Sequence, residues 1–300
     1  MRDEGFIKID GRRFGPLAAL RRKQWWSFEG LDPRRKLYFV FLALQAFPTD
    51  YVSLKVIDYG KQRRWTEDHL GKFQTAAGAA VDVSAQGKWG QLSFRGRLED
   101  GWQVEVETPH VRGRFSQRAQ SPVHRDRLLT QHLDYSIQQF ASARTEGLLR
   151  FDGQDLPFGG YGYNEHAWGV QPRHSTACWL HFWGRDLAGV VLSCLYDSGV
   201  PHNYTYLWQN GHDHRLYSPA HFSFDPALPE MPWQVRSPDL ELDVRPLAVH
   251  HTRMRMPPWP AYIDIDYHEQ LVEAEGTAWL RGKKVMIQAV GKMDHNWNRW

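Results

Sequence analysis

The fold is indicated most clearly by the glycine-bracketed stretch Gly160-Tyr161-Gly162-Tyr163-Asn164-Glu165-His166-Ala167-Trp168-Gly169. The stretch contains a tetrad made of an acid, a His, one further residue and a Trp. This tetrad returns 129 residues later as Asp294-His295-Asn296-Trp297. A single tetrad is expected by chance, whereas two, separated by slightly less than half of a 300-residue chain, indicate an internal duplication. The chain is long enough for two domains of average size.

Composition limits the classes of function that the chain can have. Hydrophobic residues make up 42% of it, and its 14 Trp favour either a β-rich core or the wall of a binding cavity. A net charge of +3 argues against bulk electrostatic capture of nucleic acid. The sequence has no GxGxxG before a helix, no Walker loop and no GxSxG, so neither a nucleotide cofactor nor serine hydrolysis is expected.

The sequence also bears on location. Basic residues gather at Arg12-Arg13, Arg21-Arg22-Lys23 and Arg34-Arg35-Lys36, either as a solvated face or as a contact with an anionic membrane surface. No apolar run approaches the roughly 18 residues of a spanning helix, and the charged start is unlike a signal peptide. Cys178 and Cys194 are expected to be reduced core residues. We therefore expect a cytoplasmic protein, membrane-peripheral if the basic cluster binds lipid.

Strand patterns dominate the chain, either as alternating apolar and polar residues or as short aromatic and β-branched runs. Strands are predicted at residues 37–44, 51–58, 92–98, 102–107, 179–183, 189–196, 240–244, 261–267, 277–280 and 284–290. Turns at residues 99–101, residues 184–186 and Gly282 make hairpins of their flanking strands. One helix is predicted, from Arg127 to Ser142. Regular short strands predict an all-β chain of antiparallel sandwiches or barrels. Turn-rich residues near 145–160 place a domain boundary there, giving domains 1–150 and 151–300.

The glycine-bracketed stretch is the first candidate site. Glycines let the backbone turn tightly or approach a ligand closely. Glu165 or a neighbouring carboxylate can fix the tautomer of a nearby His, and such a pair moves protons. Trp168, with Tyr161 and Tyr163, offers π-faces that stabilise the positive charge of a carbocation. The alternative is a buried polar latch whose members satisfy one another's hydrogen bonds.

A second candidate segment runs from Trp179 through His181 and Trp183 and is followed by Tyr196 and Asp197. A carboxylate at the end of an apolar strand is partly desolvated, which favours its protonated form and suits it to act as an acid. The alternative is an ordinary turn-initiating Asp before Ser198-Gly199.

Histidines also raise the question of a metal site. The 15 His include the close sets His212-Asp213-His214 and His250-His251. His residues two apart on a strand share a face, but no spaced third ligand accompanies either set, so no metal is expected.

Several of these motifs resemble the carotenoid 1,2-hydratase/AttH-like superfamily. Residues 24–30, Gln-Trp-Trp-Ser-Phe-Glu-Gly, resemble its N-terminal double-Trp signature, and residues 162–169 resemble its central Gly-Tyr-x-acid-His-x-Trp-Gly motif. Trp179–Arg185 and Leu195–Asp197 follow in the order seen in the hydratases. The resemblance implies two lipocalin-like antiparallel β-barrel domains in tandem, which bind long apolar substrates without a cofactor.

The resemblance also implies roles for particular residues. In the hydratases, a motif His, a motif Trp and a downstream Asp protonate an isoprenoid double bond, and these positions match His166, Trp168 and Asp197. The sequence departs from the hydratases at Glu165-His166-Ala167, where they have Asp-His-Asn. Three hypotheses follow: acid-initiated cyclisation, isomerisation or hydration of a terpenoid or polyene; a Diels–Alderase-like pericyclase; and a non-enzymatic lipid or isoprenoid carrier.

Overall fold

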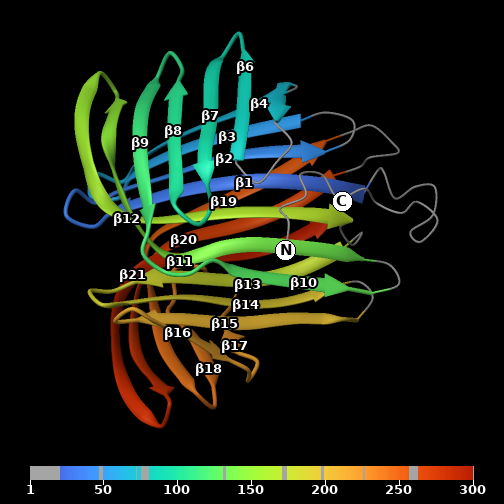
Figure 1. The fold of residues 1–300 in the computed structure, drawn as a ribbon, viewed down its shortest axis with the longest axis vertical. Coiled ribbons are helices and arrows are strands. Elements are labelled where there is room, and N and C mark those ends of the chain that lie inside the picture. Colours follow the sequence, from blue (N-terminus) through green and yellow to red (C-terminus); the bar gives the residue numbers. More distant parts are fainter. Residues whose placement is uncertain are drawn as a thin grey trace. The chain divides into compact units, whose positions relative to one another are not determined.

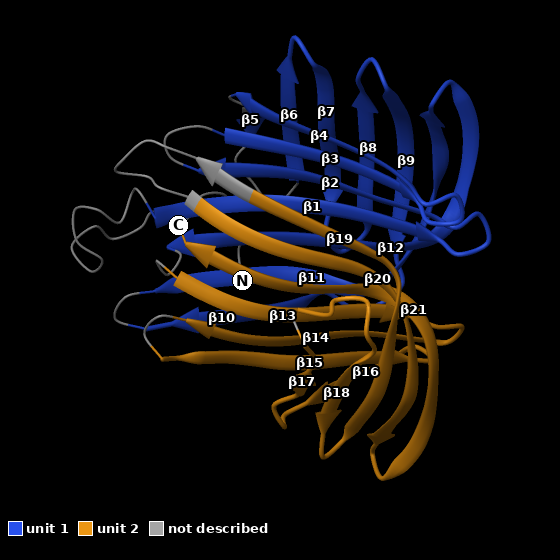
Figure 2. Cartoon of the chain, turned by 180° about the vertical axis from the view of Figure 1, so that it is seen from behind, with its two compact units in different colours: residues 1–171 blue, residues 172–300 orange. Residues whose placement is uncertain are grey.

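A computed structural model describes residues 21–46, 50–71, 73–75, 81–130, 133–170, 174–196, 199–225, 227–256 and 263–299. Every element whose bounds lie in these ranges is a β-strand, which confirms the predicted all-β class. Among the same residues, no helix is long and apolar enough to cross a membrane. The chain divides into two compact units, residues 1–171 and 172–300 (Figure 2).

The first unit is one antiparallel sheet in the order β4-β3-β2-β1-β12-β11-β9-β8-β7-β6-β5, with β10 also paired to β11 (Figure 1). Its strands are β1 (Arg22–Asp32), β2 (Leu37–Ala46), β3 (Asp50–Asp58), β4 (Arg63–Gly71), β5 (Phe73–Thr75), β6 (Val81–Gly87), β7 (Gly90–Arg97), β8 (Gly101–Glu107), β9 (Val111–Ala119), β10 (His124–Leu129), β11 (Asp134–Phe151) and β12 (Gln154–Val170). The sheet curls around its core, and His69 of β4 stacks on Trp89 in the β6–β7 turn at 4.6 Å.

The second unit repeats this arrangement in a sheet of order β16-β15-β14-β13-β21-β20-β19-β18-β17. Its strands are β13 (His174–Trp183), β14 (Leu187–Tyr196), β15 (Pro201–Gln209), β16 (His212–Leu216), β17 (His221–Ser223), β18 (Trp233–Ser237), β19 (Leu240–Met256), β20 (Ile263–Leu280) and β21 (Lys283–Arg299). In both units the first strand pairs with the last, and the last also pairs with the strand before it. This shared topology supports the internal duplication.

Phenylalanine rings packed against one another lie in the core of the first unit. Phe39 is fully buried, and its ring lies 4.9 Å from Phe41, 4.5 Å from Phe115 and 4.9 Å from Phe158. A Cβ atom at position 30 would lie 2.4 Å from Phe39 Cζ. The glycine that closes the N-terminal double-Trp signature therefore leaves room for a core ring.

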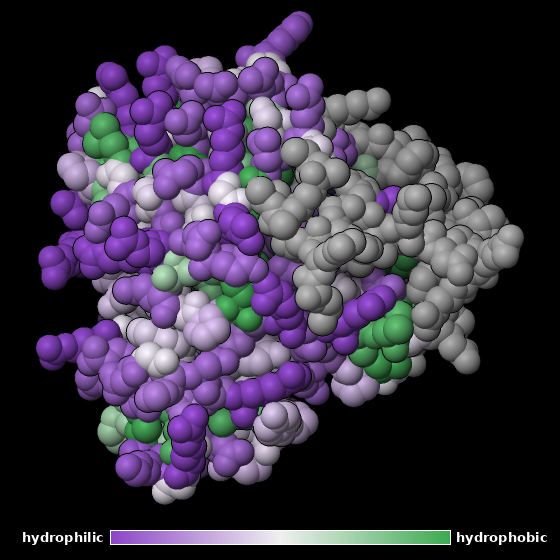
Figure 3. All heavy atoms as spheres, in the orientation of Figure 1, coloured by the Kyte–Doolittle hydropathy of each residue, from purple (hydrophilic) through white to green (hydrophobic). Residues whose placement is uncertain are grey.

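The second unit has a separate and more aliphatic core. Leu180, Phe182, Val272 and Met293 are fully buried in it. Outside the cores, the face of the molecule seen in Figure 3 is mostly hydrophilic, with hydrophobic side chains in small groups.

The predicted hairpins are confirmed. Strands β7 and β8 pair across the turn at residues 98–100, β13 and β14 across residues 184–186, and β20 and β21 across Arg281-Gly282. The last two turn residues have φ of 52° and 77°, as a tight hairpin turn requires.

The predicted helix from Arg127 to Ser142 is wrong. Residues 127–129 form the end of β10 and residues 134–142 the first part of β11, and these two strands pair antiparallel. All ten residues from Asp134 to Ala143 are buried. A strand that is buried on both faces loses the period-two pattern of a half-exposed strand, so its periodicity is misleading.

The unit boundary also differs from the predicted one at residues 150 and 151. Asp152 and Gly153, with φ of 51° and 73°, form the tight turn between β11 and β12. The turn chemistry was recognised correctly, but it joins two paired strands of one unit. The described division falls after Gln171, one strand later.

Candidate functional site

The candidate stretch lies on β12, where successive side chains point to opposite faces of the sheet. Asn164 and His166 pair with Phe28 and Trp26 of β1, which belong to the core. Directly paired residues share a face, so Asn164, His166 and Trp168 lie on the core-facing side. Glu165 therefore points to the other side, away from His166. The sequence predicted that Glu165 pairs with a nearby His, and His166, its neighbour in sequence, is not that partner.

His166 is held by three side chains on the core-facing side. Its ring stacks on Trp26 at 5.1 Å with an interplanar angle of 10°, and Trp168 lies at 4.6 Å. Gln24 Nε2 lies 2.9 Å from His166 Nε2. We call Gln24, Trp26, Asn164, His166 and Trp168 the His166 group. Three of its members come from β12 and two from β1.

The electrostatics of the His166 group keep the imidazole neutral. Burial lowers the pKa of His166 to about 3, because the charged ring would lose its hydration. An amide nitrogen can only donate, so the bond from Gln24 Nε2 makes His166 Nε2 the acceptor and leaves the proton on Nδ1. His166 is therefore a hydrogen-bonding group or a base, and it is unsuited to be the initiating acid.

Asn164 is the most unusual member of the group. It is fully buried, and neither its amide nitrogen nor its amide oxygen has a hydrogen-bond partner among the described residues. Within the same set of residues, the indole nitrogen of Trp168 also lacks a partner. Each buried polar group left in this state costs about 1–3 kcal/mol. A row of unsatisfied polar atoms beside His166 suits a bound molecule that supplies the missing partners.

Glu165 belongs to a buried network on the opposite side of β12. It accepts hydrogen bonds from the indole nitrogen of Trp25 and from Tyr163 OH, the latter at 2.6 Å. Tyr163 OH also lies 2.5 Å from Gln139 Oε1. Tyr161 lies on this side too and is partly buried. These contacts match the polar latch that was the alternative interpretation of the stretch.

The residues predicted from the second segment lie in the second unit, on the side of β13 that faces away from its core. His181 and Trp183 are buried, with ring centroids 4.7 Å apart, and Trp179 meets His181 edge-on at 6.4 Å. Tyr196, at the end of β14, is buried with its ring 6.3 Å from His202. Asp197 lies outside the described residues, so its predicted role as an acid stays a prediction.

The second tetrad has the same alternation. Asp294 points away from the core and is buried with Lys292, whose Nζ lies 2.9 Å from Asp294 Oδ2. Burial and the charge of Asp294 raise the pKa of Tyr267, which also hydrogen-bonds Asp294. His295 faces the core side, 4.7 Å from the ring of Phe224. In both tetrads, therefore, the acid anchors one face and the His occupies the other.

Other predicted features have simpler outcomes. Cys178 and Cys194 are free thiols, as predicted, and burial raises the pKa of each to about 12, so neither is a ready nucleophile. Of the basic cluster, Lys23 is buried and its pKa is lowered by burial and by Arg21, whereas Arg34, Arg35 and Lys36 are exposed. Arg12 and Arg13 lie outside the described residues.

Sequence reasoning gave no role to Asn164, Gln24 or Trp26, although all three lie in quoted motifs. The signal that could have found them is the period of a strand. Reading every second residue of β12 groups Asn164 with His166 and Trp168.

Comparison with known proteins shows the fold. No protein-family model and no curated protein matches the sequence. Among solved structures, CghA with Sch210972 has a TM-score of 0.67 at 11% identity, covering 92% of this chain and 88% of CghA. An AttH candidate protein from Nitrosomonas europaea has a TM-score of 0.65 at 12% identity, covering 97% of both chains. Kievitone hydratase from Nectria haematococca has a TM-score of 0.60 at 13% identity, covering 91% of this chain and 88% of the hydratase. The likeness confirms the tandem lipocalin-like fold that the motif resemblance implied.

Proposed function

We propose that this chain is a cofactor-independent enzyme that performs acid-initiated carbocation chemistry on a hydrophobic terpenoid or polyene. The observation that carries the proposal is the His166 group, in which a neutral imidazole lies between a stacked indole and a tilted one, beside unsatisfied amide and indole groups. The fold likeness to kievitone hydratase adds support, because its name describes the addition of water to kievitone.

The aromatic members of the group suit a cationic intermediate. A cation near an indole face is stabilised by about 0.5–2 kcal/mol, more when water is excluded. His166 is stacked on Trp26, which fixes the orientation of the imidazole. Its Nδ1–H can donate to a substrate oxygen or direct a water molecule for hydration, and Nε2 takes a proton from a carbocation, completing an elimination or cyclisation, only when it gives up the bond from Gln24.

Asn164 adds a prediction about the substrate. An amide with both atoms unsatisfied recognises a group that donates, accepts or does both, such as a hydroxyl or a carbonyl. We therefore expect an apolar substrate that carries at least one oxygen function. Asp197 is proposed as the initiating acid, on the motif resemblance alone.

A second candidate function is a pericyclase. It is favoured by the neutral state of His166, because the described members of the His166 group offer shape and hydrogen bonds and no strong acid. Such an enzyme would fold a polyene into a reactive conformer without protonating it.

The test is product formation from farnesol, geranylgeraniol and a conjugated tetraene carrying a carbonyl, followed by mass spectrometry. Loss of product in both Asp197→Asn and His166→Gln, with the fold retained, supports acid-initiated chemistry. Full activity in Asp197→Asn together with loss in Asn164→Leu supports the pericyclase. Stoichiometric binding with every compound recovered unchanged would overturn both and indicate a carrier.

A further inference from the structure

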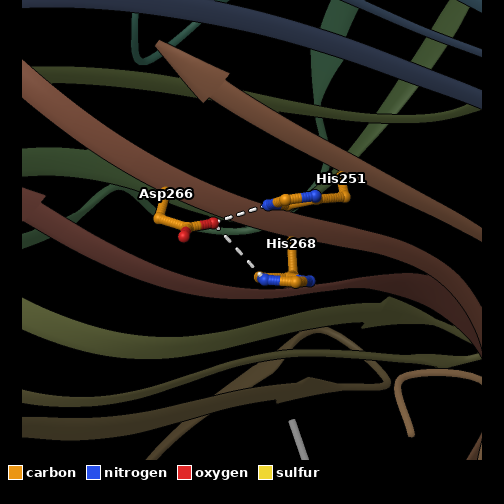
Figure 4. A group of neighbouring side chains, drawn as sticks. All are labelled: His251, Asp266 and His268. Atoms are coloured by element: carbon orange, nitrogen blue, oxygen red, sulfur yellow. Dashed lines mark hydrogen bonds and ion pairs between the residues drawn. The ribbon is translucent and has the colours of Figure 1, made fainter. Parts of the chain in front are cut away.

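The second unit gathers three metal-ligating side chains on two adjacent strands. His251 lies on β19, and Asp266 and His268 lie on β20, with their ligand atoms all within 4.8 Å of one another (Figure 4). The strand register explains the cluster. His251 pairs directly with His268, and Asp266 shares the face of His268 because it lies two residues away.

The two imidazoles converge on one carboxylate oxygen. His251 Nε2 lies 2.6 Å from Asp266 Oδ1, and His268 Nε2 lies 3.5 Å from the same oxygen. The two rings stack with centroids 4.2 Å apart and an interplanar angle of 17°. Figure 4 shows both contacts reaching the carboxylate from the same side.

These distances can be compared with what an ion requires. An ion with ligand bonds of about 2.1 Å in tetrahedral or octahedral geometry holds neighbouring donors about 3.0–3.4 Å apart. The contact of His268 with Asp266 is already close to that range. The contact of His251 with Asp266 needs to open by a few tenths of an ångström, which an exposed side chain on a strand can do by a small rotation.

The surroundings suit a bound cation. The side chains of His251, Asp266 and His268 are 51%, 29% and 23% exposed, so an ion and its water ligands can reach them. Arg253 Nη1 lies 3.9 Å from Asp266 Oδ2, the oxygen that the imidazoles do not use. The charge of Arg253 is offset by Asp264, whose carboxylate accepts two hydrogen bonds from the guanidinium at 3.2 Å. The carboxylate of Asp266 therefore leaves a net negative charge for a cation.

We propose that His251, Asp266 and His268 bind a divalent first-row transition-metal ion such as Zn²⁺, with three protein ligands and the remaining positions taken by water. Imidazole nitrogen and carboxylate oxygen are the donors that Zn²⁺ and its neighbours in the series accept in proteins. The site uses no residue of the His166 group, so it goes beyond the proposed function and can fail or succeed independently of it.

Sequence reasoning expected no metal because His250-His251 had no spaced third ligand. The fold supplies two ligands, Asp266 and His268, from the next strand. His250 does not belong to the cluster, because it is buried on the other face of β19, with Thr252 Oγ1 2.8 Å from its Nε2. The other close set, His212 and His214, lies on edge strand β16, away from this cluster in the strand order.

The experiment is calorimetric titration of Zn²⁺ into the full chain after removal of bound metal with EDTA. Because two His residues on one face of a strand, such as His212 and His214, offer a second pair of ligands to added metal, all variants carry His212→Ala and His214→Ala as a common background. One high-affinity ion per chain is expected in that background. Asp266→Asn and His268→Gln are each expected to weaken binding more than about 100-fold, since loss of even an outer-shell partner costs 10–100-fold.

The matched control is His221→Ala, which removes an exposed His of β17 in the same unit and should leave binding unchanged. If a variant loses its β-sheet circular dichroism, His251→Ala replaces it, because that side chain is half exposed. The proposal is overturned if the background chain shows no saturable Zn²⁺ binding, or if Asp266→Asn and His268→Gln both bind as tightly as the background.

Discussion

His166 and His295 occupy corresponding positions in the two sheets. Each lies on the last strand of its unit and faces the core, and the two are paired across the ladder with Trp26 and Cys178 respectively. Their surroundings have nevertheless diverged. His166 stacks on Trp26 and has the tilted ring of Trp168 at 4.6 Å, whereas His295 has the ring of Phe224 at 4.7 Å and the ring of His268 at 6.1 Å. One repeated strand arrangement thus places its imidazole in two different surroundings.

Replacing Asn164 with Leu should stabilise the protein and remove its function. The two side chains have the same branched arrangement of four heavy atoms, and removing an unsatisfied buried amide should raise the free energy of unfolding by about 1–3 kcal/mol. Urea denaturation measures the first effect, and turnover or ligand affinity measures the second. A variant that is destabilised by several kcal/mol would show that the amide is satisfied by ordered water in the free protein.

Replacing His166 with Gln should change how stability depends on pH. The pKa of His166 is about 3 in the folded chain and about 6.5 when unfolded, so the unfolded chain binds the extra proton between these values. The contribution of the neutral His166 ring to the free energy of unfolding is complete above about pH 6.5. It falls by about 1.4 kcal/mol for each pH unit below that value.

Between about pH 7 and about pH 5, the free energy of unfolding should therefore fall by about 2 kcal/mol more in the wild type than in His166→Gln. Urea denaturation of both proteins at the two pH values measures this difference, and the other histidines cancel in the comparison. Equal losses in the two proteins would mean that the ring is hydrated in the folded state.

Replacing Glu165 with Gln should affect stability and leave the chemical step unchanged. Trp25 and Tyr163 both donate to the carboxylate, whereas an amide offers a single acceptor oxygen. In the variant, Tyr163 OH is left to donate to Gln139 Oε1, and the loss of two charge-assisted hydrogen bonds should lower the free energy of unfolding by about 1–3 kcal/mol. Glu146→Gln is the control, because Glu146 forms an exposed ion pair with Arg144 and should change stability by less than about 1 kcal/mol. A large fall in kcat with unchanged stability would restore the predicted catalytic role of Glu165.

Two neighbouring glycines provide a matched test of backbone packing. A Cβ atom at position 160 would lie 2.2 Å from Leu31 O and 2.9 Å from Asp32 Cα, whereas a Cβ atom at position 159 would have no described atom within 4 Å outside its chain neighbours. Gly160→Ala should therefore destabilise the protein by about 1–3 kcal/mol, because the contacted atoms belong to the backbone. Thermal denaturation of Gly160→Ala and Gly159→Ala should separate the two, and equal melting temperatures would contradict the described β1–β12 approach.

The fold could be predicted from the sequence where its signals are local. The alternation over residues 92–98 and 102–107 depends only on residues near in sequence, and so does the turn at Gly282. The structure pairs the strands on either side of both turns, as predicted. The stretch from Arg127 to Ser142 failed because burial on both faces of β11 is a property of the whole fold. The predicted boundary near residue 150 differs from the described one because Asp152-Gly153 indicates a turn, and a turn alone does not reveal whether the strands on either side of it pair with each other.

The candidate site could be predicted only in part, for a related reason. His166 and Trp168 could be singled out from the sequence because they share a short motif, and their role in a site stays a prediction. Asp266 and His268 are 15 and 17 residues from His251 in sequence, and only the register of β19 against β20 makes them neighbours. The role of Asp197 stays a prediction.

The alternation within the tetrads has a consequence for how related sequences should be compared. The tetrad combines two separate sets of residues, because successive side chains of a strand point to opposite faces of the sheet. The acid is held by a side chain two residues before it, Tyr163 in one copy and Lys292 in the other. The His and Trp are constrained separately, by whatever the core side must accommodate. In related chains we expect the acid to co-vary with the residue two positions before it, while the His and Trp change independently of both. A sequence search that requires all four residues of the tetrad together will therefore miss chains that have retained only the residues on one face of the strand.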